Sequence, residues 1–310
     1  MNRFDLNSAI CFCTKTREYT ISYTVQGNPE GPPLVFIHGT PWSSRVWVPF
    51  AAALSSSFKI YLFDNPGYGQ SPGGVIISPR DPQDLDASLA GQAEAFAYLL
   101  REWDLTEPPH VIAHDNGGLI ALRASLNHGA EYASLCLVDV VAVGPFGSTF
   151  FKLVAANHDV FNAIPQALMN GLIRAYIQSA AYKPLSREVE DMLLLPWTSA
   201  GVQGKAGFLR QMRQADHRHA SDVEPRYGEI GKRMPVKIIW GKEDAWIPVD
   251  RAKKLAHMIG AHEMVIVEQA GHLIHYDQPL QLITELELWL SKMVNFDQRP
   301  RKPPGFVKDT

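Results

Sequence analysis

The stretch from Pro109 to Asn127 constrains the fold of this chain more than any other segment. Its first residues indicate a short buried strand, and its last residues are good helix formers. The turn between them is so short that the helix must begin almost at once. Ala113 precedes Asp115 by two positions, and Gly117 and Gly118 follow it, so little bulk surrounds the centre of the turn. The pattern predicts a sharp strand–turn–helix corner that exposes the Asp115 side chain at the edge of a sheet.

Such a corner usually carries a serine, and an aspartate in its place indicates different chemistry. A serine that attacks a saturated carbon would form an ether, which is a dead end. An aspartate forms an alkyl ester, which water can hydrolyse when a histidine acts as general base. Asp115 therefore indicates a substrate with a polarised carbon–halogen or carbon–oxygen bond. The alternative is that Asp115 only caps the following helix, because aspartate is a favoured N-cap residue.

The composition is that of a globular protein with a sizeable core. Of the 310 residues, 46% are hydrophobic and 20% are charged, which suits one large domain or a domain with an insertion. The formal net charge is −3 and no basic patch stands out, so neither nucleic acid nor an anionic membrane surface is an expected partner. No apolar run is long enough to span a membrane, and the charged segment Met1–Asn7 does not resemble a signal peptide.

The three cysteines indicate a reducing compartment, and we expect a cytoplasmic protein. Cys11 and Cys13 are too close in sequence for an ordinary disulfide, and Cys136 lies in an apolar run. The pair Cys11 and Cys13 can in principle bind a metal. Without a second Cys/His pair at suitable spacing, however, inert thiols on a strand are favoured, and we expect no metal site.

Strand and helix patterns alternate along most of the chain, which predicts a parallel sheet with helices on both faces. Paired antiparallel strands are expected over residues 9–26 at the start. The other expected strands cover residues 34–37, 59–64, 134–139, 236–240 and 263–267. The expected helices cover residues 44–55, 83–103 and 249–259, and a last helix begins at Pro279.

The pattern changes between residues 145 and 228, where the sequence is helical and aromatic and lacks a convincing buried strand. We interpret this segment as a helical cap inserted after the strand that ends at Asp139, with a core made of residues 1–144 and 229–310. An insertion after the carboxyl end of a strand lies at the functional edge of such a sheet. The alternative is a helical extension that does not contact the substrate.

Five motifs in this order resemble the α/β-hydrolase fold family, and the resemblance covers most of the chain outside the cap. They are His38-Gly39-Thr40-Pro41, the segment 64–71, the corner at Asp115, Gly241-Lys242-Glu243-Asp244 and Gly271-His272. Within that family, an aspartate at the corner resembles the haloalkane and haloacetate dehalogenases and the epoxide hydrolases. These enzymes need no cofactor, so none is expected here.

The resemblance implies a catalytic triad in the order nucleophile, acid, histidine, which Asp115, Asp244 and His272 follow. His272 would activate water, and Asp244 would orient the histidine. Asp139 is a possible alternative acid, because some haloalkane dehalogenases carry the acid after that strand. The backbone N–H groups of Thr40 and Asn116 would form the oxyanion hole or bind the leaving group.

The residues that select the substrate are expected among aromatic and imidazole side chains near the nucleophile and in the cap. Possible substrate-binding side chains are His38, Trp42, Tyr176, Tyr182 and Trp197. Haloalkane dehalogenases usually carry a tryptophan after the nucleophile, where this chain has Asn116. Epoxide hydrolases normally place two tyrosines in the cap, and the second has no counterpart between residues 208 and 213.

These observations favour a hydrolase that acts on a carbon–halogen bond of a small organic substrate, with water as co-substrate. Epoxide hydrolysis is the alternative, indicated by His114 directly before Asp115. Two further alternatives are another reaction on the same fold, such as ester or lactone hydrolysis or a step with Asp115 as base only, and a scaffold without catalysis. The oligomeric state is left open by the sequence.

Overall fold

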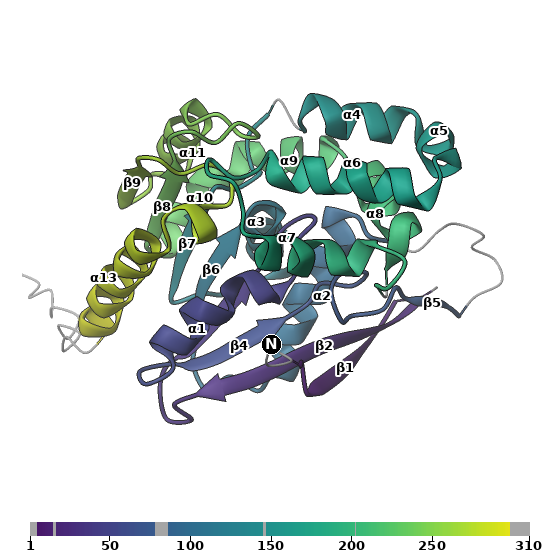
Figure 1. Ribbon diagram of the computed structural model, residues 1–310. Coiled ribbons are helices and arrows are strands. Elements are labelled where there is room, and N and C mark those ends of the chain that lie inside the picture. Colours follow the sequence, from purple (N-terminus) through teal and green to yellow (C-terminus); the bar gives the residue numbers. More distant parts are fainter. Residues whose placement is uncertain (1–4, 15–16, 78–85, 145–146, 202, 298–310) are drawn as a thin grey trace, which may run out of the picture.

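The computed structural model describes residues 5–14, 17–77, 86–144, 147–201 and 203–297, and a nine-stranded sheet forms the centre of this part of the chain (Figure 1). Eight strands follow the order β1-β2-β4-β3-β6-β7-β8-β9, and β5 pairs with β2. The strands are β1 (Ser8–Cys13), β2 (Arg17–Gly27), β3 (Pro33–Ile37), β4 (Lys59–Phe63), β5 (Val75–Ile76), β6 (His110–His114), β7 (Ser134–Val138), β8 (Val236–Gly241) and β9 (Glu263–Val267).

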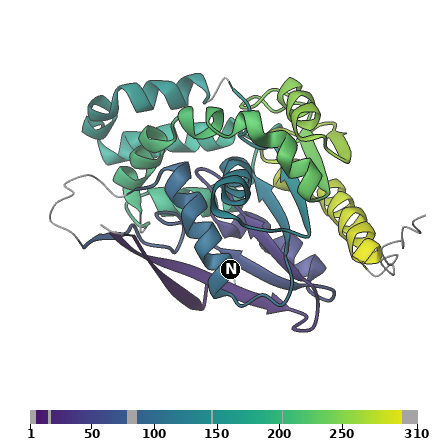
Figure 2. The same cartoon turned by 180° about the vertical axis from the view of Figure 1, so that it is seen from behind.

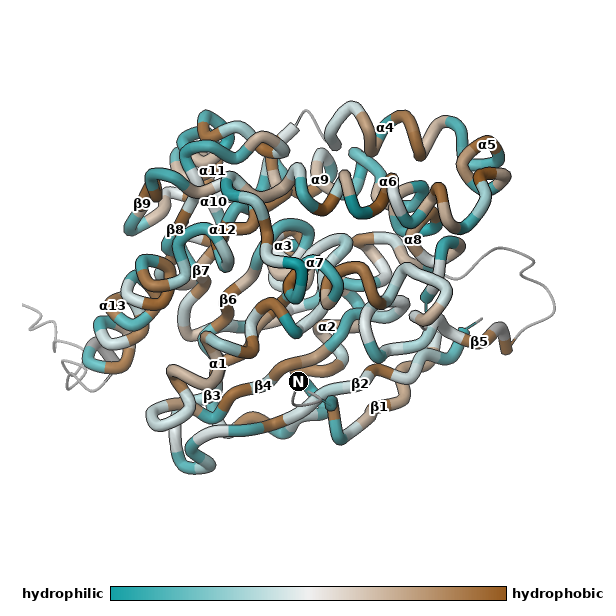
Figure 3. The backbone as a smooth tube through the Cα atoms, in the orientation of Figure 1, coloured by the Kyte–Doolittle hydropathy of each residue, from teal (hydrophilic) through white to brown (hydrophobic). Residues whose placement is uncertain are grey.

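The pairing of the strands follows their hydrophobic patterns. Strands β1, β2 and β5 pair antiparallel, whereas the pairs from β4 to β9 are parallel. Every residue of β3, β6 and β7 is buried, as expected for strands covered on both faces, and β3 and β4 are largely brown in Figure 3. The α/β-hydrolase fold expected from the sequence is confirmed.

Helices cover both faces of the sheet. On one face lie α1 (Val48–Leu54) and α13 (Pro279–Asp297), which are in front in Figure 1. Figure 2 shows the opposite face, where α2 (Leu89–Glu102) packs against α3 (Asn116–His128). The helices α10 (Tyr227–Arg233) and α11 (Asp250–Ile259) pack against each other, and α10 also contacts α3. Short elements complete the core, namely η1 (Ser44–Trp47) and α12 (Ile274–Asp277).

Between β7 and α10 the chain forms a helical layer over the sheet edge (Figure 1). This layer contains α4 (Thr149–Ala156), α5 (His158–Ala163), α6 (Gln166–Gln178), α7 (Arg187–Leu194), η2 (Leu195–Trp197), α8 (Gly204–Gln214), α9 (Arg218–Ser221) and η3 (Glu224–Arg226). Arg123 of α3 ties it to the core, because its guanidinium donates to Asp222 at 2.5 Å and to the carbonyl of His219 at 2.6 Å. No helix among the described residues is both long and apolar enough to cross a membrane.

Two details differ from the sequence prediction. The helix expected from residue 83 begins at Leu89 in the structure, because Ser88 caps it and accepts a hydrogen bond from Gly91 N at 3.1 Å; residues 83–85 lie outside the described part. The short strand β5 was not expected, since two residues carry too little periodicity to indicate a strand.

Candidate active site

Asp115 stands at the corner between β6 and α3 with φ 52° and ψ −126°. Such a conformation costs a non-glycine residue on the order of 1–3 kcal/mol, and its neighbours must hold it. Val141 N donates to the Asp115 carbonyl at 3.0 Å, and a Cβ on Gly117 would lie 2.8 Å from the carbonyl oxygen of His38. The Asp115 side chain makes no capping bond to α3, so the helix-cap alternative is wrong.

His272 connects Asp115 with Asp244. Its Nδ1 lies 2.8 Å from Asp244 Oδ2, and its Nε2 lies 3.6 Å from Asp115 Oδ1. The other Asp244 oxygen accepts the backbone N–H groups of Trp246 and Ile247, each at 2.8 Å, which fixes the carboxylate. Asp244 therefore holds the proton on Nδ1, and Nε2, which has no hydrogen-bond partner among the described residues, is the nitrogen available to a water molecule.

The charge of His272 depends on its two carboxylate neighbours. Burial of the ring opposes protonation, but the negative charges of Asp244 and Asp115 together outweigh it and raise the pKa of His272 well above its ordinary value. Esterification of Asp115 would remove one of these charges. The pKa of His272 would then fall, so that the ring could lose its proton and become free to accept one from water.

Asp139 also lies near Asp244 and His272, but its carboxyl group hydrogen-bonds to a backbone N–H and not to the histidine. Its Oδ1 accepts the backbone N–H of Gly241 at 2.7 Å, and its Oδ2 has no partner among the described residues. Burial and the charge of Asp244 raise the pKa of the Asp139 carboxyl well above its usual range. Of the two candidate acids, Asp244 is the one that makes the hydrogen bond to His272.

Thr40 supplies a donor to the nucleophile. Its backbone N–H donates to Asp115 Oδ2 at 2.6 Å. A Cβ on Gly39 would lie 2.3 Å from the same oxygen, so only glycine permits this approach. The Asn116 Nδ2 donates to Thr40 Oγ1 at 2.8 Å, and Tyr68 Oη lies 2.7 Å from that hydroxyl on the other side. Tyr68 was not predicted, although it lies within the 64–71 motif.

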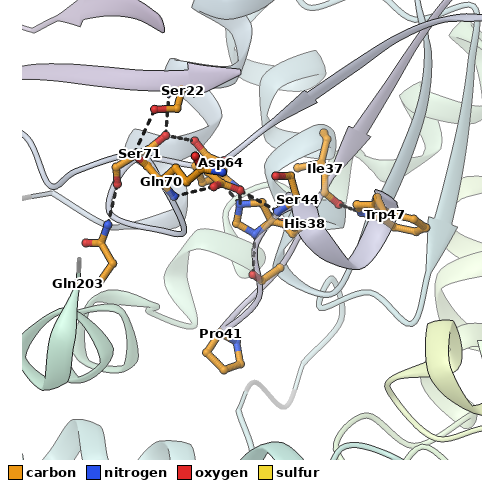
Figure 4. A network of polar contacts seen from close by, with 12 residues as sticks. Ser22, Ile37, His38, Pro41, Ser44, Trp47, Asp64, Gln70, Ser71 and Gln203 are labelled. Carbon is orange, nitrogen blue, oxygen red and sulfur yellow. Dashed lines mark hydrogen bonds and ion pairs between the residues drawn. The ribbon is translucent and has the colours of Figure 1, made fainter. Parts of the chain in front are cut away.

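A network around His38 and Asp64 positions the Thr40 loop (Figure 4). His38 Nδ1 lies 2.9 Å from the carbonyl of Gly39, and its Nε2 accepts from Asn65 N at 3.0 Å. Burial lowers the pKa of His38, so the ring is neutral. The Asp64 carboxylate accepts backbone N–H groups of Ser44 and Gln70, each at 2.7 Å. His38 is thus a structural residue with both ring nitrogens occupied.

A cavity of about 200 Å³ opens onto Asp115. Its walls are mainly apolar, and its lining includes Thr40, Asp115, Asn116, Val141, Val143, Phe151, Tyr176, Trp246, Ile247, Pro248 and Arg251. The Tyr176 ring stacks on Trp246 with centroids 4.2 Å apart. Burial and the nearby charge of Asp115 raise the pKa of the Tyr176 phenol, which keeps its proton. Among the lining residues that the structure describes, Arg251 is the one cation.

Comparison with known proteins identifies the family. The model of the Alpha/beta hydrolase family matches residues 34–286. The chain belongs to this family. A crystal structure of an α/β-hydrolase fold protein from Burkholderia ambifaria has 37% identity and a TM-score of 0.81, covering 91% of this chain and 97% of that one.

More distant members of the family carry different activities in their names. The pimeloyl-[acyl-carrier protein] methyl ester esterase of Vibrio atlanticus is 24% identical over 286 residues, covering 90% of this chain and 99% of the esterase. The structure named as an ancestral haloalkane dehalogenase, AncHLD2, has 16% identity and a TM-score of 0.73, covering 89% of this chain and 97% of that one. At these identities the similarity shows the hydrolase fold.

The structure places the four aromatic residues that were expected to bind substrate in this hydrolase in very different positions. Tyr176 lines the cavity, whereas Tyr182 is 50% exposed and lies outside the lining. The Trp197 indole N–H donates to the Pro41 carbonyl at 2.8 Å and is not free for a leaving group. Trp42 is buried behind Trp246, with ring centroids 5.8 Å apart.

Two cavity residues were missed at the sequence level. Trp246 stacks on His272 with centroids 5.1 Å apart, and its position two residues after Asp244 was the available signal. Arg251 lies at the start of α11, and its Nη1 donates to the carbonyl of Gly144. No described acidic side chain forms an ion pair with it, so this arginine of the cavity lining has no carboxylate partner among the described residues. Nothing in the sequence distinguished this arginine from those on the surface.

Proposed function

We propose that this hydrolase uses Asp115 as a nucleophile toward a saturated carbon and cleaves the resulting ester with water activated by His272. The observation that carries the proposal is the asymmetric environment of the Asp115 carboxylate. Oδ2 is bound by Thr40 N at 2.6 Å, while Oδ1 lies on the side of His272 at the cavity. One oxygen is held for charge stabilisation and the other is available for attack.

The first step forms the ester. Asp115 Oδ1 donates an electron pair to the substrate carbon, and the leaving group departs with the electrons of the broken bond. An ester substrate is less suited to this nucleophile, because attack on an acyl carbon would produce an anhydride. The strained corner and the N-terminus of α3 keep the carboxylate at the cavity.

The second step hydrolyses the ester. A water molecule gives its proton to His272 Nε2 and attacks Cγ of Asp115, and the negative charge develops on Oδ2 next to Thr40 N. Asp244 stabilises the imidazolium that forms, because it lies 2.8 Å from Nδ1. The bond between Cγ and the alkyl oxygen then breaks, that oxygen takes the proton from the imidazolium, and the alcohol leaves. The new carboxyl group of Asp115 releases its proton to solvent, which regenerates the carboxylate.

A carbon–halogen bond in a small organic molecule is the target we propose. The cavity of about 200 Å³ is lined mainly by apolar side chains, which suits such a substrate. A departing halide needs hydrogen-bond donors and no proton. The Tyr176 hydroxyl and the cationic Arg251, both in the lining, supply this stabilisation in the absence of the usual tryptophan after the nucleophile.

Epoxide opening is the second candidate, and the position of Tyr176 favours it. Ring opening leaves an alkoxide on the substrate, which needs a proton donor in the cavity. Tyr176 keeps its phenolic proton because burial and the Asp115 charge raise its pKa. The surface position of Tyr182 leaves Tyr176 as the single cavity phenol among the described residues, whereas epoxide hydrolases normally have two.

The variant His272→Gln tests this mechanism by intact mass after incubation with panels of organic halides and epoxides. Without its base the enzyme is expected to stall at the Asp115 ester. A mass gain equal to the whole substrate indicates an opened epoxide, and a gain equal to the substrate minus the hydrogen halide indicates dehalogenation. His257→Gln, on the exposed face of α11, is the matched control and is expected to turn over without accumulating an adduct.

The double variant Asp115→Ala/His272→Gln locates the adduct. The mass gain is expected to disappear in this variant. If the adduct persists there, or if His272→Gln forms none with a substrate that the wild type converts, then Asp115 is not the nucleophile and the proposed mechanism is wrong.

A further inference from the structure

A pair of thiols lies on the exposed face of the outermost strand, far along the sheet from the catalytic strand. Cys11 and Cys13 are two residues apart in β1, so their side chains point to the same face. Both are exposed and neither forms a disulfide. Their sulfur atoms are 3.6 Å apart. Three strands, β2, β4 and β3, separate β1 from β6, whose end carries Asp115.

The pairing of β1 with β2 brings a carboxylate to the same place. Cys13 is directly opposite Glu18 in the antiparallel register. Their side chains share one face of the sheet, and Glu18 Oε2 lies 3.9 Å from Cys13 Sγ. One ligand atom each from Cys11, Cys13 and Glu18 can be found within 4.8 Å of one another. The sequence shows only the cysteine pair, and the strand register supplies the third group.

The spacing of these atoms matches a tetrahedral metal centre. Two sulfurs at the usual zinc–sulfur distance and a tetrahedral angle are about 3.8 Å apart, and a sulfur and a carboxylate oxygen are about 3.5 Å apart. The corresponding distances here are 3.6 Å between the sulfurs and 3.9 Å between Cys13 Sγ and Glu18 Oε2. Both are within about 0.4 Å of the tetrahedral values, and the third pair of atoms, Cys11 Sγ and a Glu18 oxygen, lies within 4.8 Å.

We propose that Cys11, Cys13 and Glu18 form a binding site for one thiophilic divalent cation such as Zn²⁺ or Cd²⁺. Two thiolates and one carboxylate provide three ligands, and the exposed side of the site admits water as the fourth. The proposal departs from the expectation of inert thiols, which rested on the lack of a second Cys/His pair. It is separate from the hydrolase site and does not depend on the proposed reaction.

Titration with Cd²⁺ alone tests the site, using the full chain in its reduced form and the ultraviolet absorption of the cadmium–thiolate bond. We expect this absorption to saturate at one cadmium per chain. The double variant Cys11→Ser/Cys13→Ser is expected to lose it, although buried Cys136 remains. Glu18→Gln is expected to raise the midpoint concentration by at least about tenfold, the lower end of the loss seen when even an outer-shell partner is removed.

Glu30→Gln is the matched control, because Glu30 is also an exposed carboxylate but lies in the turn after β2. Its midpoint is expected to equal that of the wild type. The proposal is overturned if the wild type shows no saturable absorption, if the absorption persists in the double cysteine variant, or if Glu18→Gln and Glu30→Gln have the same midpoint.

Discussion

The variant Asp244→Asn tests which buried carboxyl group assists His272 during hydrolysis of the proposed ester. Asparagine keeps the shape of the side chain but has one acceptor oxygen, so the variant removes the charge and cannot accept both the Nδ1 proton and the Trp246 and Ile247 N–H groups. Opposite unit charges at the 2.8 Å separation of Asp244 Oδ2 and His272 Nδ1 attract by about 6 kcal/mol at an effective dielectric constant of about 20. Since each 1.4 kcal/mol is about tenfold in rate, we expect hydrolysis to slow by about four orders of magnitude.

Asp139→Asn is the matched control for this prediction. Burial and the Asp244 charge raise the pKa of the Asp139 carboxyl, which favours its uncharged form, so its amide replacement removes little charge. The amide can still accept the N–H of Gly241 that the carboxyl accepts at 2.7 Å. We expect hydrolysis in this variant to remain within about tenfold of the wild type, since a retained neutral hydrogen bond changes the free energy by about 1 kcal/mol or less.

Rapid mixing with a substrate, acid quenching and intact mass separate the two steps. Asp244→Asn is expected to form the Asp115 ester at nearly the wild-type rate and to accumulate it, because attack by the carboxylate does not need a base. Thermal unfolding of both variants checks that each is folded. Equal slowing of hydrolysis in Asp139→Asn and Asp244→Asn, with both folded, would refute the assignment of Asp244 as the acid.

Three further predictions concern the same cavity. The rate of hydrolysis of the isolated ester is expected to rise with pH and then level off. Its midpoint is expected below the resting pKa of His272, because the esterified Asp115 no longer raises that pKa. A pH-independent rate in stopped-flow measurements would contradict this. Tyr176→Phe keeps the ring stacked on Trp246 but removes the proton donor, so kcat/KM for epoxides is expected to fall by about a hundredfold and that for halides by less. Arg251→Gln is expected to raise KM by about ten- to a hundredfold for substrates with a carboxylate, and to leave KM for neutral substrates unchanged in steady-state assays.

The core and the proposed triad were accessible from the sequence because local patterns determine them. Buried parallel strands are largely apolar runs, so β3 and β7 could be located to within a residue. The carboxyl ends of such strands lie at one edge of the sheet, and residues that follow different strands, such as Asp115, Asp244 and His272, therefore converge. Glycine at position 39 of this edge also has a local reason, because a Cβ there would collide with the Asp115 carboxylate.

The cap could not be predicted in the same way, because its residues are placed by packing between helices that share no register with the sheet. Tyr176 and Tyr182 are six residues apart, yet the first faces the cavity from α6 and the second lies on the surface after that helix has ended. Trp197 illustrates the same difficulty, because its N–H is used to hold the cap on the Pro41 carbonyl. Arg251 enters the cavity from the core side, where the end of β8 turns into α11. The chemistry of this hydrolase is thus proposed from sheet-edge residues that the sequence identifies, whereas its substrate depends on side chains that only the folded cap and its neighbours bring together.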